Sequence, residues 1–434
     1  MNESLESPLE PVPRTRAAGA TAGRGGALAG FLRRRLIERL AALRGGSIRL
    51  VDGDLDRVLG EPADGCAEPL RCTLRVEDPE FYLALARHGS VGAAEAYMDG
   101  AWHCDDLVAL VRILVRNRAL LDGMEQGTAR LGGLLMRAWH ALRRNTRGGS
   151  RRNIAAHYDL GNALFELFLD RSMMYSSAIF ADATETLEQA QQRKLDRICR
   201  KLQLGPASRV VEIGTGWGGF ALHAARHYGA HVTTTTISQQ QFELARARVE
   251  AEGLGDRITL LLRDYRELDG QYDALVSIEM IEAIGHQYLD TYFAKVASLL
   301  RRDGMALIQA ITIEDHRYRQ ALRSVDFIKR HIFPGSFIPS VSAMLEAAAK
   351  TDLRLFNLED IGPSYALTLR HWRQRFLAHV HEVRAQGYPD RFIRMWEFYL
   401  AYCEGGFLER SIGDVQMLLT RPDCRRPSWL PDLS

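Results

Sequence analysis

The sequence contains no apolar run that approaches the roughly 20 residues needed to span a membrane. Its first residues, MNESLESPLEPVPR, are acidic and rich in proline, which excludes the basic start and apolar centre of a signal peptide. We therefore expect a cytoplasmic protein that contacts a membrane only from outside.

Metal-binding patterns are missing as well. None of the six cysteines belongs to a C-x-x-C pair, and no histidine stands near one at the spacing of a zinc site. We predict reduced thiols and no metal centre. The cysteines are Cys66, Cys72, Cys104, Cys199, Cys403 and Cys424.

Neither sign of charge dominates the composition. Lysine and arginine together number 56 against 54 aspartates and glutamates, a formal net charge of +2, which argues against a broadly polycationic nucleic-acid binder. Only five of the basic residues are lysines. Arginine suits bidentate phosphate contacts, but heavy arginine use also follows genome composition, and we favour the second explanation.

The length of 434 residues, 46% of them hydrophobic, is enough for two domains. Residues 1–27, rich in Pro, Gly, Ala and Thr, are expected to form a disordered leader. Alternating runs such as SIRLVDG and CTLRVED, followed by helical periodicity, predict a smaller N-terminal α+β domain over 28–142. The run RRNTRGGSRR predicts a basic linker at 143–152, normally solvated but also suited to a phosphate headgroup. Residues 153–434 form the second domain.

A basic amphipathic helix is expected near the start of the N-terminal domain, from the run FLRRRLIERLAALRGG. It could lie on a membrane surface with its arginines facing anionic headgroups, or dock on the domain with a solvated basic face, which we favour. One side carries Phe31, Leu32, Leu36, Ile37, Leu40 and Leu43, and the remainder carries Arg33, Arg34, Arg35 and Arg39.

Apolar runs alternate with amphipathic helices at βαβ intervals beyond Asn153. This rhythm predicts an α/β fold with a mostly parallel, doubly wound sheet covered on both faces. The strand candidates are RVVEIG, HVTTTTIS, ITLLLRD, YDALVSIEM and MALIQAITI.

The segment RVVEIGTGWGGFALHAA places glycines at Gly214, Gly216 and Gly219, the G-x-G-x-x-G spacing of a dinucleotide-binding turn. An NAD site also needs an acidic residue about 20 residues later, at the end of the second strand. That strand, HVTTTTIS, contains no acid. Glu212 precedes Gly214 by two residues instead, and Gly218 completes a G-x-G-x-G spacing, which points to S-adenosylmethionine.

The rest of this cofactor site is predicted from residues after the next two strands. Glycines let the backbone approach the ligand, and N–H groups at the following helix offer donors to its carboxylate end. Asp264 and Tyr265 are expected at the adenine, one by hydrogen bond and one by stacking, although Asp264 could equally cap a turn. Thr236, Ser238 and Gln241 stand where the ribose would lie.

Seven separated segments, in order, resemble those of the cyclopropane-fatty-acyl-phospholipid synthases over about residues 150–420. VGAAEAYMDGAWHCDDL also resembles the N-terminal domain of the bacterial enzymes. The segments are NIAAHYDLGNALFELFLDRSMMYSSAIF, VVEIGTGWGGFA, TISQQQ, RDYREL, SIEMIEAIG, DFIKRHIFPGSFIPS and RMWEFYLAYCEGGF.

This resemblance implies a Rossmann-like enzyme that transfers a methylene from S-adenosylmethionine to the cis double bond of acyl chains in phospholipid. It also implies a homodimer, peripheral at the inner face of the cytoplasmic membrane. The family is held to use a bound bicarbonate ion as base, fixed by a Cys, a Glu, a His and a Tyr. The matching Glu is Glu282 in IEAIG and the matching Tyr is Tyr365 in IGPSYALTL.

The other two bicarbonate ligands differ from the family pattern. Ser177 replaces the Cys that follows Tyr175 and Ser176, two residues that the resemblance places at the cofactor, and Gln309 replaces the His. The His that commonly follows the Glu is also replaced, by Ala283. Ser and Gln can still bind an anion, but the lost imidazole removes a proton carrier. A methyl- or methylene-branched product is therefore an alternative to the favoured cyclopropane.

Several residues have two interpretations. Glu279 in SIEM could orient the ligand or cap a helix, and His157 and Tyr158 could close over the cofactor or pack the first helix. Tyr97 and Trp102 could lie at the headgroup level or be buried, and the aromatics of DFIKRHIFPGSFIP and WEFYLAYCEGGF could line an acyl tunnel or form core. Competing functions are methylation of a soluble small molecule and a catalytically silent lipid-binding protein.

Overall fold

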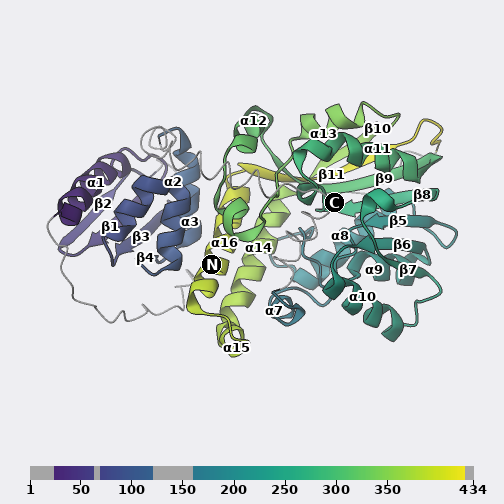
Figure 1. The fold of residues 1–434 in the computed structure, drawn as a ribbon, viewed down its shortest axis with the longest axis horizontal. Coiled ribbons are helices and arrows are strands. Elements are labelled where there is room, and N and C mark those ends of the chain that lie inside the picture. The colour runs from purple at the N-terminus through teal and green to yellow at the C-terminus, as the bar shows by residue number, and fades with distance from the viewer. Residues whose placement is uncertain (1–23, 63–68, 121–159, 426–434) are drawn as a thin grey trace. The chain divides into compact units, whose positions relative to one another are not determined.

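The computed structural model describes residues 24–62, 69–120 and 160–425 (Figure 1). The predicted linker at 143–152 and most of the predicted leader lie outside the described residues. The chain divides into two compact units. The first comprises Met1–Trp139, Ser324–Ile332 and Arg373–Glu409, and the second comprises His140–Arg323, Phe333–Trp372 and Arg410–Ser434.

A small four-stranded sheet with the order β2-β1-β3-β4 lies in the first unit. β1 pairs antiparallel with β2 and parallel with β3, and β4 is antiparallel to β3. This sheet lies within the smaller N-terminal α+β domain predicted over 28–142, but the first unit also includes residues 324–332 and 373–409, which the sequence predicts to lie in the second domain. The elements are α1 (Arg24–Leu40), β1 (Ser47–Asp52), β2 (Leu55–Leu59), β3 (Arg71–Val76), α2 (Glu80–Met98), β4 (Trp102–Cys104), α3 (Leu107–Arg116), a π-helix (Ile328–Ile332), α15 (Val380–Ala385) and α16 (Asp390–Leu408).

The basic helix α1 packs against α2 with only part of its apolar side. Leu36 and Leu40 are buried, which confirms that the helix docks on its domain. Phe31 and Leu28 are about half exposed, so the end of the helix nearer the N-terminus presents large apolar side chains to solvent.

Helix α16 packs against α2 and α3 inside the first unit. Tyr97 is 1% exposed, and its hydroxyl donates a 2.7 Å hydrogen bond to Oε2 of Glu397 on α16. Trp102 is also buried and donates from Nε1 to the carbonyl of Ala93. The buried interpretation of Tyr97 and Trp102 is therefore confirmed.

The close approach of α16 to α3 depends on Gly405, where a β-carbon would lie 2.7 Å from Cγ1 of Val111. We expect Gly405→Val to lower the free energy of unfolding by about 1–3 kcal/mol, because a branched side chain overpacks this contact. Urea denaturation measures the effect. Gly255→Ala is the control, expected within about 0.5 kcal/mol of the parent, since nothing lies within 4 Å of a β-carbon there. Equal stability of both variants would contradict the packing.

The second unit is built on a seven-stranded sheet with the order β10-β11-β9-β8-β5-β6-β7 (Figure 1). The five predicted strands are β5 to β9, and they pair in parallel. β11 is antiparallel to β9, and β10 is antiparallel to β11. The strands are β5 (Arg209–Ile213), β6 (His231–Thr236), β7 (Ile258–Leu262), β8 (Tyr272–Ile278), β9 (Leu300–Ile313), β10 (Arg354–Asp360) and β11 (Ile412–Thr420).

Helices cover both faces of this sheet, and each face has its own apolar core. Val210 of β5 packs with α8, α9 and α10 on one face, whereas Val211 packs with α11 and α13 on the other, as alternation along a strand requires. The helices are α7 (Asn162–Glu166), α8 (Leu187–Lys201), α9 (Gly219–Tyr228), α10 (Gln239–Ala251), α11 (Leu289–Leu299), α12 (Asp315–Arg323), α13 (Val341–Ala348) and α14 (Gly362–Ala378, whose last residues belong to the first unit), with 3₁₀ turns at Tyr265–Glu267, Ile281–Ala283 and His286–Tyr288.

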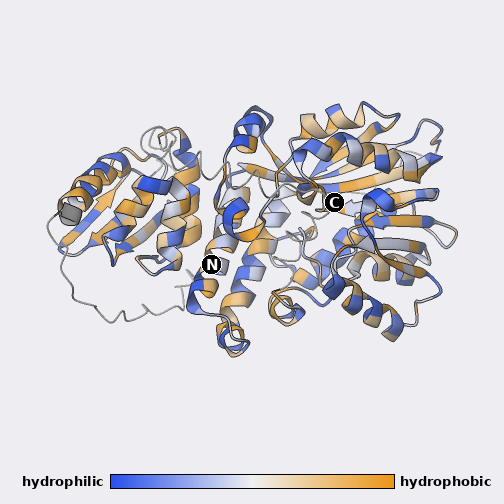
Figure 2. Ribbon diagram, in the orientation of Figure 1, coloured by the Kyte–Doolittle hydropathy of each residue, from blue (hydrophilic) through white to orange (hydrophobic). Residues whose placement is uncertain are grey.

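Hydrophobic residues follow the strands of this sheet, whereas α12 is largely hydrophilic (Figure 2). The second unit therefore has the doubly wound α/β architecture that the sequence predicts. Among the described residues we find no helix that combines the length and the hydropathy of a membrane span.

Candidate active site

The glycine-rich turn connects β5, in the middle of the sheet, to α9. Gly214, Gly216 and Gly218 have φ angles of +99°, +50° and +88°, a region that L side chains rarely adopt. A β-carbon on Gly216 would meet nothing within 4 Å, whereas one on Gly219 would lie 2.8 Å from the carbonyl oxygen of Ser172. The first three glycines therefore shape the turn, the open space beside Gly216 fits a ligand cradle, and Gly219 permits close packing.

Glu212 lies on β5 with 2% exposure. Thr234 on β6 donates a 2.6 Å hydrogen bond to its Oε2, and the Thr234 hydroxyl also bonds that of Thr215 at 2.7 Å. Burial raises the pKa of Glu212 to about 8, against the opposing effects of Thr234 and Lys194. The acid predicted at the cofactor thus joins the first two strands behind the glycine turn.

Thr236, Ser238 and Gln241 come together where β6 ends and α10 begins. Ser238 caps α10 by accepting a hydrogen bond from the backbone N–H of Gln241, and the Thr236 hydroxyl donates to Oε1 of Gln241 at 2.9 Å. All three side chains are buried. Their predicted contact with the ribose stays a prediction, and within the described residues they already order this turn.

Asp264 and Tyr265 follow β7, as predicted. The Asp264 carboxylate accepts two hydrogen bonds from the guanidinium of Arg266, at 2.8 and 2.6 Å, and also caps the 3₁₀ turn. The Tyr265 ring meets the ring of Tyr292 edge-on at 5.7 Å. Because Arg266 shares the Asp264 carboxylate, an adenine contact of Asp264 stays a prediction.

Glu279, directly after β8, is the centre of a buried polar cluster. Its Oε1 accepts hydrogen bonds from the backbone N–H of Ser177 and from Nε2 of Gln309, both at 2.8 Å. Its Oε2 accepts a 2.7 Å hydrogen bond from the hydroxyl of Tyr365 on α14. Burial raises the pKa of Glu279, although these three donors oppose the shift. The carboxylate thus bonds these three groups rather than the first N–H groups of a helix, and the predicted role of Glu279 in orienting the ligand stays a prediction.

Three of the four residues predicted to hold bicarbonate thus contact one side chain. Ser177 contributes its backbone N–H, since its hydroxyl donates to the carbonyl of Ala178 at 2.9 Å. Gln309 and Tyr365 contribute their side chains. A bicarbonate ion bound by the same three donors would require Glu279 to move away, so these residues do not fit the ion as they stand.

Glu282, the fourth predicted ligand, lies on the turn Ile281–Ala283. Its Oε1 accepts a 2.6 Å hydrogen bond from the backbone N–H of Ile311, and its Oε2 is buried without a hydrogen-bond partner among the described residues. Burial, together with the charge of Glu279, raises the pKa of Glu282 to about 8. A second carboxyl group therefore stands near Glu279.

Sequence reasoning missed Asp414 and Lys194. Asp414 on β11 is fully buried, and its Oδ2 accepts from Nε2 of Gln309 at 3.2 Å. Burial and the neighbouring charge of Glu279 raise its pKa well above the ordinary value. The only signal was a lone acid within the apolar strand IGDVQMLLT.

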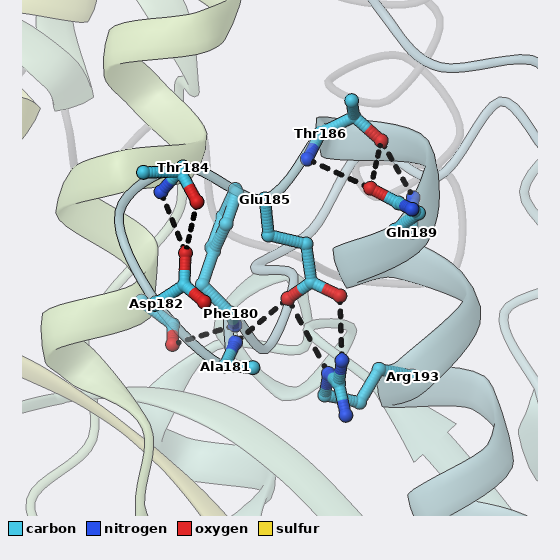
Figure 3. A network of polar contacts seen from close by, with 9 residues as sticks. Phe180, Ala181, Asp182, Thr184, Glu185, Thr186, Gln189 and Arg193 are labelled. Carbon is cyan, nitrogen blue, oxygen red and sulfur yellow. Dashed lines mark hydrogen bonds and ion pairs between the residues drawn. The ribbon is translucent and has the colours of Figure 1, made fainter.

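Lys194 is a fully buried cation on α8, and its Nζ donates a 2.8 Å hydrogen bond to Oγ of Ser176. Burial lowers its pKa to about 8, whereas Glu279, Asp414 and other acids raise it. The start of α8 is set by the polar network in Figure 3, where Thr186 and Gln189 form a capping box and Arg193 pairs with Glu185 at 2.6 Å. The signal for Lys194 in the sequence was that lysine is rare, with only five in the chain.

Aromatic rings surround Tyr175, next to the polar cluster. Its ring centroid lies 5.2 Å from that of Phe165 and 5.2 Å from that of Trp372, and Trp372 is 6.1 Å from Tyr365. In the first unit, Trp396 of α16 stacks on Phe392, a packing role. His157 and Tyr158 lie outside the described residues.

A parallel sheet whose first strand is central and leads into a left-handed glycine turn is a switch point, where α/β proteins bind nucleotide-like ligands. With Glu212 in place of an NAD-type acid, this chain is an S-adenosylmethionine-dependent methyltransferase. It belongs to the mycolic acid cyclopropane synthetase family, whose model matches residues 145–417.

Individual relatives agree with this family. Tuberculostearic acid methyltransferase UfaA1 of Mycobacterium tuberculosis is 38% identical over 94% of this chain and 94% of its own. Cyclopropane-fatty-acyl-phospholipid synthase of Escherichia coli K12 is 37% identical over 80% of this chain and 87% of its own. A crystal structure of mycolic acid cyclopropane synthase CmaA1 complexed with SAH and CTAB matches with a TM-score of 0.59 and 28% identity, covering 62% of this chain and 98% of that one.

Proposed function

We propose that this enzyme transfers the methyl carbon of S-adenosylmethionine to the cis double bond of an unsaturated acyl chain in membrane phospholipid and closes a cyclopropane ring. The observation that carries the proposal is the pair of half-buried carboxyl groups, Glu279 and Glu282, after the strand that neighbours β5. An alkene is a weak nucleophile, and the cation formed on methylation needs negative charge and exclusion of water.

The glycine turn is suited to hold the cofactor, which supplies an electrophilic methyl group when bound. Glu212 stands behind Gly214 and Gly216, while Thr236 ends β6 and Asp264 follows β7. These residues hold and orient the donor under the proposal. They need not take part in proton transfer.

Under the proposal, the cluster around Glu279 and Glu282 stabilises the positive charge on the acyl chain and accepts the proton of the new methyl group. When the π electrons form the new carbon–carbon bond, the sulfur keeps the electrons of the broken carbon–sulfur bond. A positive charge remains on the other alkene carbon, where Glu282 and Glu279 stabilise it. A base then removes a proton from the new methyl group, and the electrons of that C–H bond close the ring.

Contact with a membrane is proposed at α1. Phe31 and Leu28 are about half exposed, and Arg34 and Arg35 on the same helix are exposed. Apolar side chains beside arginines suit an anionic lipid surface. A homodimer peripheral at the inner membrane face stays part of this proposal.

A second product is favoured by two observations. The relative that matches 94% of this chain is named a methyltransferase. Gln309 and Ala283 also replace the imidazoles of the family pattern. Loss of a proton from a chain carbon next to the cation would give a methyl-branched, unsaturated acyl chain. A shift of hydride from the methylated carbon to the cationic carbon, followed by loss of a proton from the methyl group, would give a methylene-branched chain. Both products share the methylation step.

The test uses purified protein, methyl-labelled S-adenosylmethionine and vesicles of unsaturated phospholipid, with mass spectrometry and proton NMR of the released fatty acids. We expect label in the acyl chains, with upfield ring protons for the cyclopropane or vinylic or branched-methyl signals for the second product. A soluble-substrate methyltransferase would instead leave the lipid unlabelled while converting S-adenosylmethionine with a small acceptor.

A further inference from the structure

Glu279 receives donors from three separate parts of the second unit. Ser177 lies before α8, Gln309 is on β9 and Tyr365 is on α14, yet each donates to the same carboxylate at 2.7–2.8 Å. Ser177, Gln309 and Tyr365 are buried, and Glu279 is half-buried. Such convergence of three donors is what an anion site requires, and here the anion is a side chain of the protein.

The backbone of Glu279 is adapted to this arrangement. Its φ angle is +48°, a left-handed conformation that is costly for a residue other than glycine. Its backbone N–H donates a 2.8 Å hydrogen bond to the carbonyl of Gln309. The conformation is therefore held by β9, which also supplies one of the donors to the carboxylate.

We propose that the Glu279 carboxylate takes the place of bicarbonate as the anion and proton acceptor of this reaction, so the enzyme needs no bicarbonate. This inference rests on the proposed function, since it assigns the base that removes the proton from the methylated acyl chain. The carboxylate becomes a carboxylic acid as the C–H electrons form the new bond. It returns the proton to solvent before the next turnover.

Asp414 is the carboxyl group paired with Glu279 in the proposed proton acceptor. Burial and the charge of Glu279 raise the pKa of Asp414 well above its ordinary value, and its Oδ2 accepts a hydrogen bond from Nε2 of Gln309 at 3.2 Å. Its Oδ1 is buried and has no hydrogen-bond partner among the described residues. A neutral Asp414 leaves Glu279 as the charged member of the pair. Two neighbouring carboxyl groups hold one proton between them because two negative charges side by side repel.

The other ionisable groups facing Glu279 are Lys194, Glu282 and Tyr365. Lys194 favours the carboxylate form, and Glu282 disfavours a second negative charge nearby. Lys194 therefore offsets the charge of Glu279 while Glu282 is protonated, and the cluster becomes net negative when Glu282 ionises at higher pH. In neither state do these groups carry a net positive charge that would attract an additional anion.

The test compares wild type, Glu279→Gly and Glu279→Gln in buffer freed of carbon dioxide and in buffer with added bicarbonate, with labelled phospholipid product as the readout. We expect wild type to be equally active in both buffers and Glu279→Gln to lose about 100-fold in both, because its amide fills the site but accepts no proton. Glu279→Gly should be inactive without bicarbonate and regain activity with it, since the three donors are then free to hold the ion.

A second readout is independent of lipid turnover. Carbon-13 NMR of labelled bicarbonate should show bound ion with Glu279→Gly and none with wild type, while Glu314→Gly, which changes a partly exposed glutamate after β9, should behave as wild type. Circular dichroism checks that each variant is folded. Wild-type product that requires bicarbonate, or bicarbonate bound to wild type, would overturn this inference and leave the proposed function intact. No labelled lipid from wild type under any condition would remove the proposed function and, with it, the assigned proton transfer.

Discussion

Replacing Glu282 with glutamine is expected to lower the rate of product formation by about 100- to 1000-fold, the usual loss when a charge that stabilises a transition state is removed. The variant keeps the acceptor for the Ile311 N–H and the volume of the side chain. It loses the negative charge at Oε2, the buried oxygen that has no hydrogen-bond partner among the described residues. Initial rates with labelled S-adenosylmethionine and phospholipid vesicles measure the loss.

The pH dependence of the reaction rate tests the same role of Glu282. Burial raises the pKa of Glu282 to about 8, so the wild-type rate should rise with pH up to about 8 as the carboxylate form accumulates. The residual activity of Glu282→Gln should lack the part of this rise that belongs to Glu282. A variant with the rate and the pH profile of wild type would remove Glu282 from the reaction.

Stability should change in the opposite direction. The folded protein binds the Glu282 proton more tightly than the unfolded chain does, because the ordinary pKa is 4.5 and the folded value is about 8. Wild type therefore loses stability as pH rises from about 4.5 to about 8, on the order of 3 kcal/mol from this group. Glu282→Gln avoids that loss, so we expect it to unfold at a higher urea concentration than wild type at pH 8.

Replacing Lys194 with methionine is expected to cost about 3–5 kcal/mol of stability, because it leaves buried carboxylates without their counter-charge. Lys194 is fully buried, bonds Ser176 at 2.8 Å and interacts with Glu279, Asp414 and Glu212. Activity should fall in parallel, since the same cation sustains the charged form of Glu279. Thermal unfolding and product formation are the two measurements.

Lys350→Met is the matched control, because Lys350 is exposed and pairs with the exposed Asp290 at 2.7 Å. Surface ion pairs contribute little, so this variant should unfold and react like wild type. If Lys194→Met were as stable and active as Lys350→Met, the buried carboxyl groups would have to be neutral without the lysine.

The sequence by itself determined the parallel part of the fold and the class of enzyme. The strand runs that become β5 to β9 are apolar and closely spaced, and the turn after RVVEIG needs glycines because its backbone adopts positive φ angles. These are local properties, and so they can be read without knowing which segments meet. The family motifs likewise predicted that Glu282 and Tyr365 belong to one site.

Only the tertiary structure decided what those residues contact. Ser177, Gln309 and Tyr365 are 102, 30 and 86 residues from Glu279 in the chain, and the order of the strands and the position of α14 bring them to one carboxylate. Asp414 joins them because β11 lies antiparallel beside β9. Periodicity records which residues of a segment are buried, but the pairing of buried polar groups depends on which distant segments become neighbours.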